Sequence, residues 1–319
     1  MTQLMSSPAV TVIIPTHNHP GPLAFSIASV LQQSFEDLSL VVIGDGVGDD
    51  TRGVVFEAMK QDSRVSFVDR PKSPRHAEAV RHEVICSVDS PFIAYQGDDD
   101  LWLPNHLQVM LQLLDDADFV HPLPVFVKSN GTLHHAPTDL SRPGCLAWHL
   151  SETPRNAISL TGVTHSRASY LKLPYGWRET PAGRWTDHYM WQQYFLSDDV
   201  RLKTSPLSTT IKLAANERSS MSAAERTAEV SALWKQILDR TNFEEKWQAK
   251  VASAVRQTSV SLQLAHTEKS DLLQQTRRER DSLRHNLDAI RRSTSWRFTE
   301  PLRDLKAAWL KWRTSGQRT

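Results

Sequence analysis

Short apolar runs alternate with longer amphipathic stretches through the first third of the chain. Four runs are too short and too uniformly apolar to form one face of a helix, and we expect buried strands at residues 10–14, 38–43, 65–68 and 92–95. Apolar residues recur at helical spacing between them, which predicts helices over residues 22–33, 51–60 and 74–88. This alternation is typical of βαβ units and predicts a mostly parallel sheet sandwiched by helices.

The pattern becomes less regular after residue 95 and changes again after residue 221. We expect helices over residues 104–114 and 186–195, strands over 119–127, 159–165 and 200–213, and an irregular proline-rich stretch over 137–154. From Ser222 onward the sequence favours helix, and proline is absent until residue 301. We therefore expect two domains, an α/β domain over residues 1–221 and an α-helical region over residues 222–319.

A heptad repeat can be traced through part of the helical region. Its apolar positions are Leu262, Leu273, Leu283, Leu287 and Ile290. However, Lys269, Thr276 and Arg280 occupy the same seam, where a coiled coil needs apolar residues. The periodicity leaves two alternatives open, an amphipathic helix packed on a neighbour and a coil that self-associates.

The net charge of +1 conceals an asymmetry between the two expected regions. Residues 223–319 contain 19 Lys and Arg against 12 Asp and Glu, whereas residues 1–222 contain 18 against 24. The helical region is therefore basic. Because no recognised nucleic-acid-binding module accompanies this charge, we do not expect nucleic acid as a partner.

The cysteines and the amino terminus indicate a compartment. Cys86 and Cys145 are too few for a disulfide framework, and we expect two buried free thiols in a reducing environment. Residues 1–8 lack the basic start and the apolar stretch of a secretory signal, and no run approaches the roughly 20 apolar residues of a membrane span. We therefore expect a cytoplasmic protein, either free or peripheral at the inner face of the cell membrane.

Polar residues follow three of the expected strands at the point where each strand ends. They are Pro-Thr-His-Asn at residues 15–18, Gly-Asp-Gly at 44–46 and three consecutive aspartates at 98–100. In an open α/β sheet, ligands bind beyond the carboxyl ends of the strands, so we expect these segments to converge on one crevice. The local alternatives are helix caps for the first segment and turns for the other two.

The three aspartates suggest a metal site. Adjacent carboxylates repel one another unless a cation or water screens them. A hard divalent cation held between carboxylates and diphosphate oxygens would stabilise the charge that accumulates on a diphosphate leaving group, and all-oxygen ligation suits Mg²⁺ or Mn²⁺. The sequence therefore predicts Asp98, Asp99 and Asp100 as candidate metal ligands.

Three segments occur in a characteristic order: VTVIIPTHN, VVIGDGVGDDT and IAYQGDDDLWLPNHL. This set resembles the family 2 glycosyltransferases of the GT-A fold, and the resemblance extends over residues 9–215. It implies a Rossmann-like nucleotide-binding half and the transfer of a hexosyl or deoxyhexosyl group from a UDP, GDP or dTDP sugar, usually with inversion. The implied acceptor is a growing polysaccharide or a lipid-linked glycan.

The resemblance implies roles for residues near the donor. Pro15, Thr16 and Asn18 correspond to the nucleotide pocket, and Asp45 to the carboxylate that faces the base. Arg81 corresponds to an arginine that often lies beside the donor, with a solvated helical arginine as the alternative.

The aspartate segment matches the metal and ribose-diphosphate motif of the family. Asp98 and Asp99 would serve the leaving group, Asp99 being the favoured ligand, and Asp100 would support the loop. The sequence departs from the family pattern at three places, where aspartates or a Ser-Thr pair are common: Gly44, Val47–Gly48 and Gly97.

A catalytic base is implied further along the chain. Asp187, near the start of the expected helix over 186–195, matches the carboxylate that removes the proton from the acceptor hydroxyl. The alternative is a first-turn carboxylate that only complements the helix dipole. Glu179 and His188 are the fallback candidates.

Aromatic and basic residues near this base have two interpretations each. Trp177, Trp185 and Trp191 could stack on a sugar ring or could form a packed core. Arg218 could close over the diphosphate as a planar fork or could lie at the surface.

The end of the chain carries a second, shorter resemblance. Residues 293–303, STSWRFTEPLR, are similar to an ending found on many bacterial cell-surface polysaccharide glycosyltransferases. Residues 277–319 contain 12 Lys and Arg against 5 Asp and Glu, with interspersed tryptophans, which suits an interfacial helix on anionic lipid. The alternatives are docking to a partner and a solvated helix.

Two other functions compete with glycosyl transfer. A nucleotidyltransferase would need an early glycine-rich, basic phosphate loop, and residues 15–21 contain no Lys or Arg. A catalytically inactive GT-A scaffold is the other, and the departures at Gly44 and Gly97 favour it.

Overall fold

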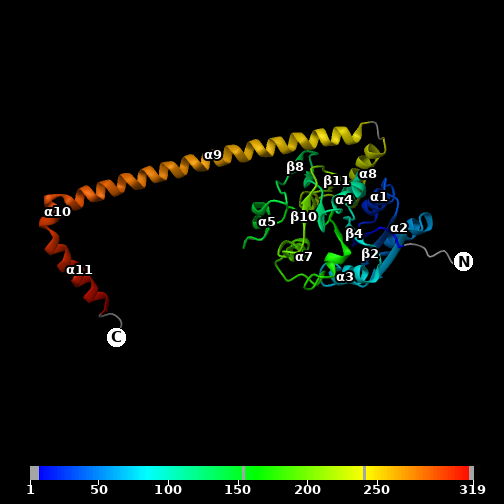
Figure 1. Cartoon of the computed structure of the whole chain (residues 1–319), viewed down its shortest axis with the longest axis horizontal. Helices are drawn as coiled ribbons and strands as arrows, with labels where there is room; N and C mark the ends of the chain where they lie inside the picture. The colour runs from blue at the N-terminus through cyan, green and yellow to red at the C-terminus, as the bar shows by residue number, and fades with distance from the viewer. Residues whose placement is uncertain (1–6, 153–154, 240–241, 316–319) are drawn as a thin grey trace. The chain divides into compact units, whose positions relative to one another are not determined.

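The computed structural model describes residues 7–152, 155–239 and 242–315 (Figure 1). The chain divides into two compact units between Thr258 and Ser259. The expected boundary at 221/222 falls inside the first unit, because helix α8 (Ala223–Leu238) packs against helix α1 (Pro20–Leu31). The first unit therefore contains the α/β fold together with the start of the helical region.

Seven strands form the main sheet of the first unit. Their order across the sheet is β10 (Leu202–Thr204), β6 (Phe119–His121), β9 (Thr164–Ser166), β4 (Phe92–Tyr95), β1 (Val10–Thr16), β2 (Leu38–Asp45) and β3 (Val65–Arg70). Strand β1 is parallel to β2 and β4, and β3 is parallel to β2. Strand β9 runs antiparallel to both its neighbours. The expected mostly parallel sheet is confirmed.

A second sheet contains four short strands, in the order β5 (Leu101–Trp102), β11 (Thr210–Leu213), β7 (Val125–Val127) and β8 (Leu133–His135). Strand β5 follows the three aspartates directly and pairs antiparallel with β11. The single strands expected over 119–127 and 200–213 are wrong, since each is two strands in different sheets. Pro122, Pro124 and Pro206 lie in the breaks, where proline removes a ladder donor. Of the strand expected over 159–165, only its end is present, as β9.

The helices expected in the α/β part are present; the one over residues 186–195 has the expected bounds, and the ends of the others are shifted. The expected helices are α1, α2 (Asp49–Gln61), α3 (Glu78–Ser87), α4 (His106–Leu113) and α7 (Thr186–Phe195). The structure adds α5 (Pro143–His149) inside the stretch expected to be irregular, α6 (Arg167–Tyr170) and the 3-10 helix η1 (Ala215–Arg218). Residues 153–154 of that stretch lie outside the described residues.

The central strands β1, β2 and β4 are buried on both faces, which explains their continuous apolar sequences. Along β1, Ile13 faces a cluster that includes Tyr95 and Trp191. Its neighbours Val12 and Ile14 face the opposite cluster, which contains apolar residues of α1. The two layers hold the carboxyl ends of β1 and β4 in fixed register, with Ile13 beside Tyr95.

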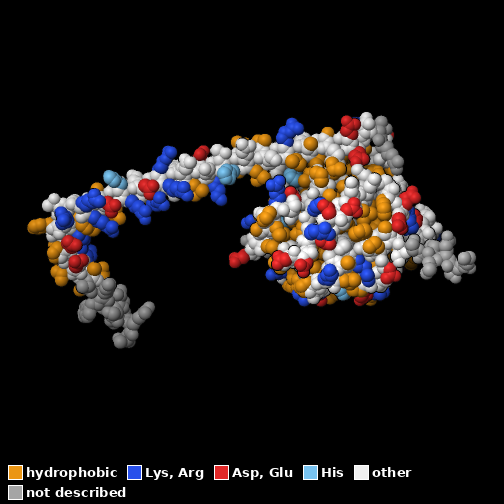
Figure 2. All heavy atoms as spheres, in the orientation of Figure 1, with side chains coloured by type: hydrophobic (Ala, Val, Ile, Leu, Met, Phe, Trp, Pro, Cys, Tyr) orange, Lys and Arg blue, Asp and Glu red, His pale blue; other side chains and the backbone are white. Residues whose placement is uncertain are grey.

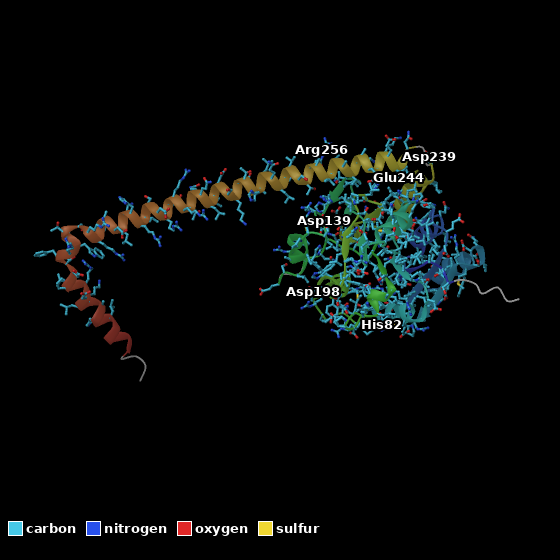
Figure 3. The ribbon with its side chains drawn as sticks, in the orientation of Figure 1. His82, Asp139, Asp198, Asp239, Glu244 and Arg256 are labelled. Carbon is cyan, nitrogen blue, oxygen red and sulfur yellow. The ribbon has the colours of Figure 1, made fainter. Side chains whose placement is uncertain are left out.

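A third core joins the second sheet to α8 and to the first turns of α9 (Phe243–Arg292). Trp247 packs there, and its indole nitrogen donates to the carbonyl of Ser208 at 2.9 Å. Glu244, marked on α9 in Figure 3, accepts a hydrogen bond from the side-chain amide of Asn105. These contacts explain why the first unit extends past residue 221.

The second unit consists of the rest of α9 with α10 (Thr294–Phe298) and α11 (Glu300–Ser315). All five apolar heptad residues in α9 are exposed, from 43% at Leu287 to 68% at Leu283. Figure 2 shows Lys and Arg side chains along α9 and hydrophobic side chains around α10 and α11. Among the helices in the described ranges, none combines the length and the apolar character needed to cross a membrane.

The expectation for the cysteines is wrong for one and partly wrong for the other. Cys86 is exposed and Cys145 is half-buried, and both are free thiols. Cys86 lies in the last turn of α3, and its sulfur contacts the ring of His82 on the solvent side of that helix.

Candidate active site

A cavity of about 630 Å³ opens at the carboxyl ends of the central strands. Its wall contains Pro15 near the end of β1, Arg81 of α3, Asp98 and Asp99 after β4, and Asp187 of α7. Five of the predicted site residues therefore lie around one cavity, although they come from four separate segments. The rule that ligand sites form beyond the carboxyl ends of parallel strands predicted the convergence of Pro15, Asp98 and Asp99, whereas Arg81 and Asp187 were implied by the family resemblance.

Sequence reasoning missed other side chains in the wall. Lys212 projects from β11, and a basic group on the same wall comprises Arg75, His76 and Arg184. A lysine in the short apolar strand Thr-Ile-Lys-Leu was the available signal for Lys212. No comparable signal existed for the others, because they lie on loops.

Asp98 is held by the last residue of β1 and by the segment that follows it. Its Oδ2 accepts a hydrogen bond from the hydroxyl of Thr16 at 2.8 Å and one from the backbone N–H of His17 at 3.4 Å. His19 Nδ1 lies 3.1 Å from the same oxygen, and this hydrogen bond to Asp98 raises the pKa of His19. The predicted residues Thr16 and Asp98 thus contact each other directly.

Asp99 is almost buried and lies beside two other carboxylates. Burial, followed by repulsion from Asp100, raises the pKa of Asp99 to about 6. The guanidinium of Arg226, in the first turn of α8, donates to its Oδ2. A positive charge at this carboxylate is therefore stabilising, whether from an arginine or from a metal ion.

Asp100 differs from its two neighbours, because it does not line the cavity and its side chain is fully buried. Its Oδ1 accepts from the backbone N–H of Leu213 at 2.8 Å. Its Oδ2 accepts from Lys212 Nζ at 2.8 Å and from the hydroxyl of Thr161. Both oxygens are thus engaged in holding the loop to β11.

Asp98 and Asp99 fit a hard divalent cation. Their carboxylates face the cavity and form an all-oxygen donor set, which suits Mg²⁺ or Mn²⁺. Across the described ranges of the chain, no three His, Cys, Asp or Glu side chains gather as metal ligands. A cation here would take its remaining ligands from phosphate oxygens and water, as Mg²⁺ commonly does.

Three predicted nucleotide-site residues, Thr16, Asn18 and Asp45, do not form part of the cavity wall. Asn18, at φ 54°, accepts from the N–H of Gly48 at 2.8 Å through its side chain. Asp45 accepts from Lys72 Nζ at 2.7 Å and from the N–H of Ser73 at 2.6 Å. Burial works against ionisation of Asp45, but these donors outweigh it and lower its pKa.

Arg81 is buried with part of its hydrogen-bonding capacity unused. It donates from Nη2 to the carbonyl of His76 at 2.7 Å, and its guanidinium lies 4.5 Å from the ring centre of Trp177. Its Nε and Nη1 have no hydrogen-bond partner among the residues that the structure describes. Burial lowers the pKa of Arg81, although Asp187 opposes the effect. An anionic ligand in the cavity would supply the missing acceptors.

Asp187 lies in the first turn of α7 and lines the same cavity as Asp98 and Asp99. Its Oδ2 accepts from the N–H of Leu160 at 2.9 Å. Burial raises the pKa of Asp187, and Arg81 partly opposes the shift. A carboxylate with a raised pKa is a stronger base than an ordinary aspartate.

The fallback bases do not reach this cavity. Glu179 is exposed and lines a different surface hollow. His188 is buried, and its Nε2 lies 2.7 Å from the carbonyl of His149.

The tryptophans near Asp187 have divided roles. Trp177 and Trp191 belong to the core, whereas Trp185 is 54% exposed and lines the cavity.

Both alternatives for Arg218 are wrong. Its side chain is buried and bonds Glu229 at 2.7 and 2.6 Å, so it is neither at the surface nor in the cavity.

The glycines that depart from the family pattern are required by packing. A Cβ on Gly97 would lie 2.5 Å from Asp100 Oδ2 and 2.8 Å from Thr161 Oγ1. A Cβ on Gly44 would lie 2.9 Å from the ring of Phe67. Any side chain at either position would displace its neighbours.

A mostly parallel α/β sheet with acidic residues and a large cavity at its strand ends is the arrangement expected of a glycosyltransferase of the GT-A fold. The chain belongs to glycosyl transferase family 2, whose pattern matches residues 11–173. The structure of S. aureus TarS 1-349 in complex with UDP-GlcNAc has the same fold, with a TM-score of 0.52 and 14% identity, and the match covers 77% of this chain and 71% of that one.

Two bacterial enzymes are similar in sequence. The UDP-Glc:alpha-D-GlcNAc-diphosphoundecaprenol beta-1,3-glucosyltransferase WfgD of Escherichia coli is 28% identical over 176 residues, which cover 51% of this chain and 68% of WfgD. The GalNAc(5)-diNAcBac-PP-undecaprenol beta-1,3-glucosyltransferase of Campylobacter jejuni is 29% identical over 110 residues, 34% of this chain and 36% of that enzyme. The chain thus spans about two thirds of the first relative and about a third of the second.

Proposed function

We propose that the protein is a metal-dependent, inverting glycosyltransferase. It moves a hexosyl or deoxyhexosyl group from a UDP, GDP or dTDP sugar to a glycan acceptor. The observation that carries this proposal is the placement of Asp98, Asp99 and Asp187 around one cavity. The acceptors named for the two relatives are linked to undecaprenol through a diphosphate, which supports a lipid-linked acceptor.

The donor occupies the sheet side of the cavity. Asp98 and Asp99 would hold Mg²⁺ or Mn²⁺, which when bound stabilises the charge on the departing diphosphate. Arg81 and Lys212 add fixed positive charge to the same wall. Asp100, also a candidate ligand from the sequence, would serve to hold the loop in place through its buried contacts.

The nucleoside lies beyond the diphosphate, against the ends of β1 and β2. Pro15 lines the cavity there, and Thr16 fixes the Asp98 carboxylate. Asn18 orders the loop after β2 by accepting from Gly48. On the family resemblance, Asp45 faces the nucleotide base. Its carboxylate would then accept from the base as well as from Lys72 and Ser73.

The reaction is a single displacement. Asp187 takes the proton of the acceptor hydroxyl while that oxygen forms a bond to the anomeric carbon. The bond from this carbon to the diphosphate oxygen breaks, and the nucleoside diphosphate leaves with the electron pair. Because attack and departure occur on opposite faces of the sugar, the configuration inverts.

The acceptor sugar binds beside Asp187. Trp185 precedes α7 and is exposed at 54% within the cavity wall, although a large aromatic side chain is normally buried. Its ring offers an apolar face to a sugar next to the catalytic base.

The helices of the second unit bring the enzyme to a lipid surface. Phe298 is 85% exposed, and Leu302 and Leu305 of α11 are both 68% exposed. Basic residues alternate with them, which suits anionic lipid. A lipid-linked acceptor would be presented at the same surface. Self-association of the helices is the competing role.

A thermal-shift measurement tests the central proposal. UDP, GDP and dTDP are added separately, each with and without Mn²⁺. One nucleotide should raise Tm, and Mn²⁺ should increase the shift, because binding to the folded state stabilises it. Absence of any nucleotide-dependent stabilisation would favour the inactive scaffold. The variants Asp98→Asn and Asp99→Asn should retain Tm but lose the Mn²⁺ contribution.

A further inference from the structure

Arg226 reaches the acidic end of the cavity from outside it. Its Nη2 donates to Asp99, and its Nη1 lies 3.3 Å from His19 Nε2. The other ring nitrogen of His19 lies 3.1 Å from Asp98. Arg226 and His19 line a separate hollow of about 570 Å³ between the starts of α1 and α8. The carboxylates of Asp98 and Asp99 therefore contact His19 and Arg226, respectively, and both aspartates also line the cavity.

The backbone that carries Arg226 is fixed in place. The start of α8 is closed by a capping box, in which Ser222 and Glu225 bond each other's backbone N–H groups. The next residue, Thr227, packs on Gly21 of α1 so closely that a Cβ on Gly21 would lie 2.0 Å from its hydroxyl oxygen. Only the flexible side chain of Arg226 can therefore leave Asp99, while its α-carbon stays beside the site.

We propose that Arg226 is a tethered cation that competes with the divalent metal ion for Asp99, so that the metal binds tightly only together with a nucleotide diphosphate. This inference rests on the proposed metal-dependent function. An oxygen that accepts from a guanidinium has a reduced affinity for a second cation. A diphosphate offers the guanidinium an alternative partner of matching geometry, which frees Asp99 for the metal.

The competition has a measurable signature without any enzymatic turnover. Free Mn²⁺ is titrated against the full chain by electron paramagnetic resonance, first without nucleotide. Arg226→Gln should bind Mn²⁺ about tenfold more tightly than the wild type, within the usual range of coupling between two sites. The nucleotide that gives the largest thermal shift should then strengthen Mn²⁺ binding less in the variant than in the wild type. Arg226→Lys keeps the charge without the planar fork and should fall between them.

A matched control removes an arginine–aspartate pair elsewhere. Arg201→Gln breaks the pair with Asp118 at the edge of the main sheet and should leave Mn²⁺ binding unchanged. Equal or weaker Mn²⁺ binding by folded Arg226→Gln would overturn the inference while leaving the proposed function intact. If neither wild type nor variant binds Mn²⁺ with any of UDP, GDP or dTDP, the proposed metal dependence fails together with the inference.

Discussion

Lys212 donates from its ammonium group to Asp100 Oδ2 at 2.8 Å, and this ion pair joins the loop after β4 to β11 in the second sheet. Asp100 is fully buried, whereas the Lys212 side chain is 21% exposed and lines the cavity. One residue of the aspartate triplet therefore anchors the site, and it leaves the other two carboxylates facing the ligand.

Removing this anchor should destabilise the fold. We expect Asp100→Ala to lower the free energy of unfolding by about 3–5 kcal/mol, because Lys212 would lose its partner in a largely buried position. Denaturant titration measures the change. Asp69→Ala is the matched control, since its pair with Arg52 is partly exposed and should cost less than about 1 kcal/mol. Similar losses for both variants would contradict a structural role for Asp100.

Asp187→Asn should abolish transfer without affecting the donor. An amide cannot accept the acceptor proton, so we expect kcat to fall by at least about a hundredfold. The nucleotide-induced thermal shift should match that of the wild type, because the change lies on the acceptor side. Turnover close to that of the wild type would exclude Asp187 as the base.

The pH dependence of transfer should report the same carboxylate. Asp187 acts only when deprotonated, and burial raises its pKa above the ordinary value of about 3.9. Activity should therefore be lost as the pH falls through the raised pKa, while an unperturbed aspartate would still be ionised. The profile of kcat between about pH 4 and 8 tests this, with Tm recorded at each pH to exclude unfolding. An acid limb at or below about pH 3.9 would argue for a different base.

Trp185→Ala should weaken the acceptor and spare the donor. We expect KM for the acceptor to rise about five- to tenfold, comparable to the ~0.5–1.5 kcal/mol of an aromatic contact. Trp185→Phe should recover most of the loss. Trp148→Ala, which removes a 40% exposed tryptophan outside the cavity wall, is the control. An unchanged acceptor KM in Trp185→Ala would remove the stacking role.

The exposed residues of α10 and α11 should govern binding to anionic vesicles. We expect the triple change Phe298→Ser, Leu302→Ser and Leu305→Ser to reduce partitioning at least about tenfold, because it removes the apolar contact and keeps the basic charge. Vesicle sedimentation measures the effect. Leu196→Ser alters a 70% exposed leucine of the first unit and should have no influence. Retained partitioning in the triple variant would contradict membrane contact through these residues. A concentration-dependent oligomer of the wild type that the triple change abolishes would favour self-association.

The local pattern of apolar residues was enough to predict the central strands and the crevice at their carboxyl ends. The apolar runs at β1, β2 and β4 are buried on both faces, so their sequences are continuous and recognisable. The parallel order then places their carboxyl ends together, which is why Pro15, Asp98 and Asp99 could be assigned to one crevice.

Short strands after β4 could not be predicted in the same way. Strands β6 and β7 are separated by only three residues, yet they pair in different sheets. Their membership depends on partners at distant positions, such as β10 and β11, and no local period encodes that choice.

The division of labour that the family resemblance implies among the aspartates has a physical basis only in tertiary contacts. Asp98, Asp99 and Asp100 are adjacent in sequence, but they face Thr16 and His19, Arg226, and Lys212 respectively. The sequence alone determined that carboxylates would gather at the end of β4. Tertiary structure decided which of them are free to meet a ligand, because the neutralising cations come from α8 and β11, more than a hundred residues further along the chain.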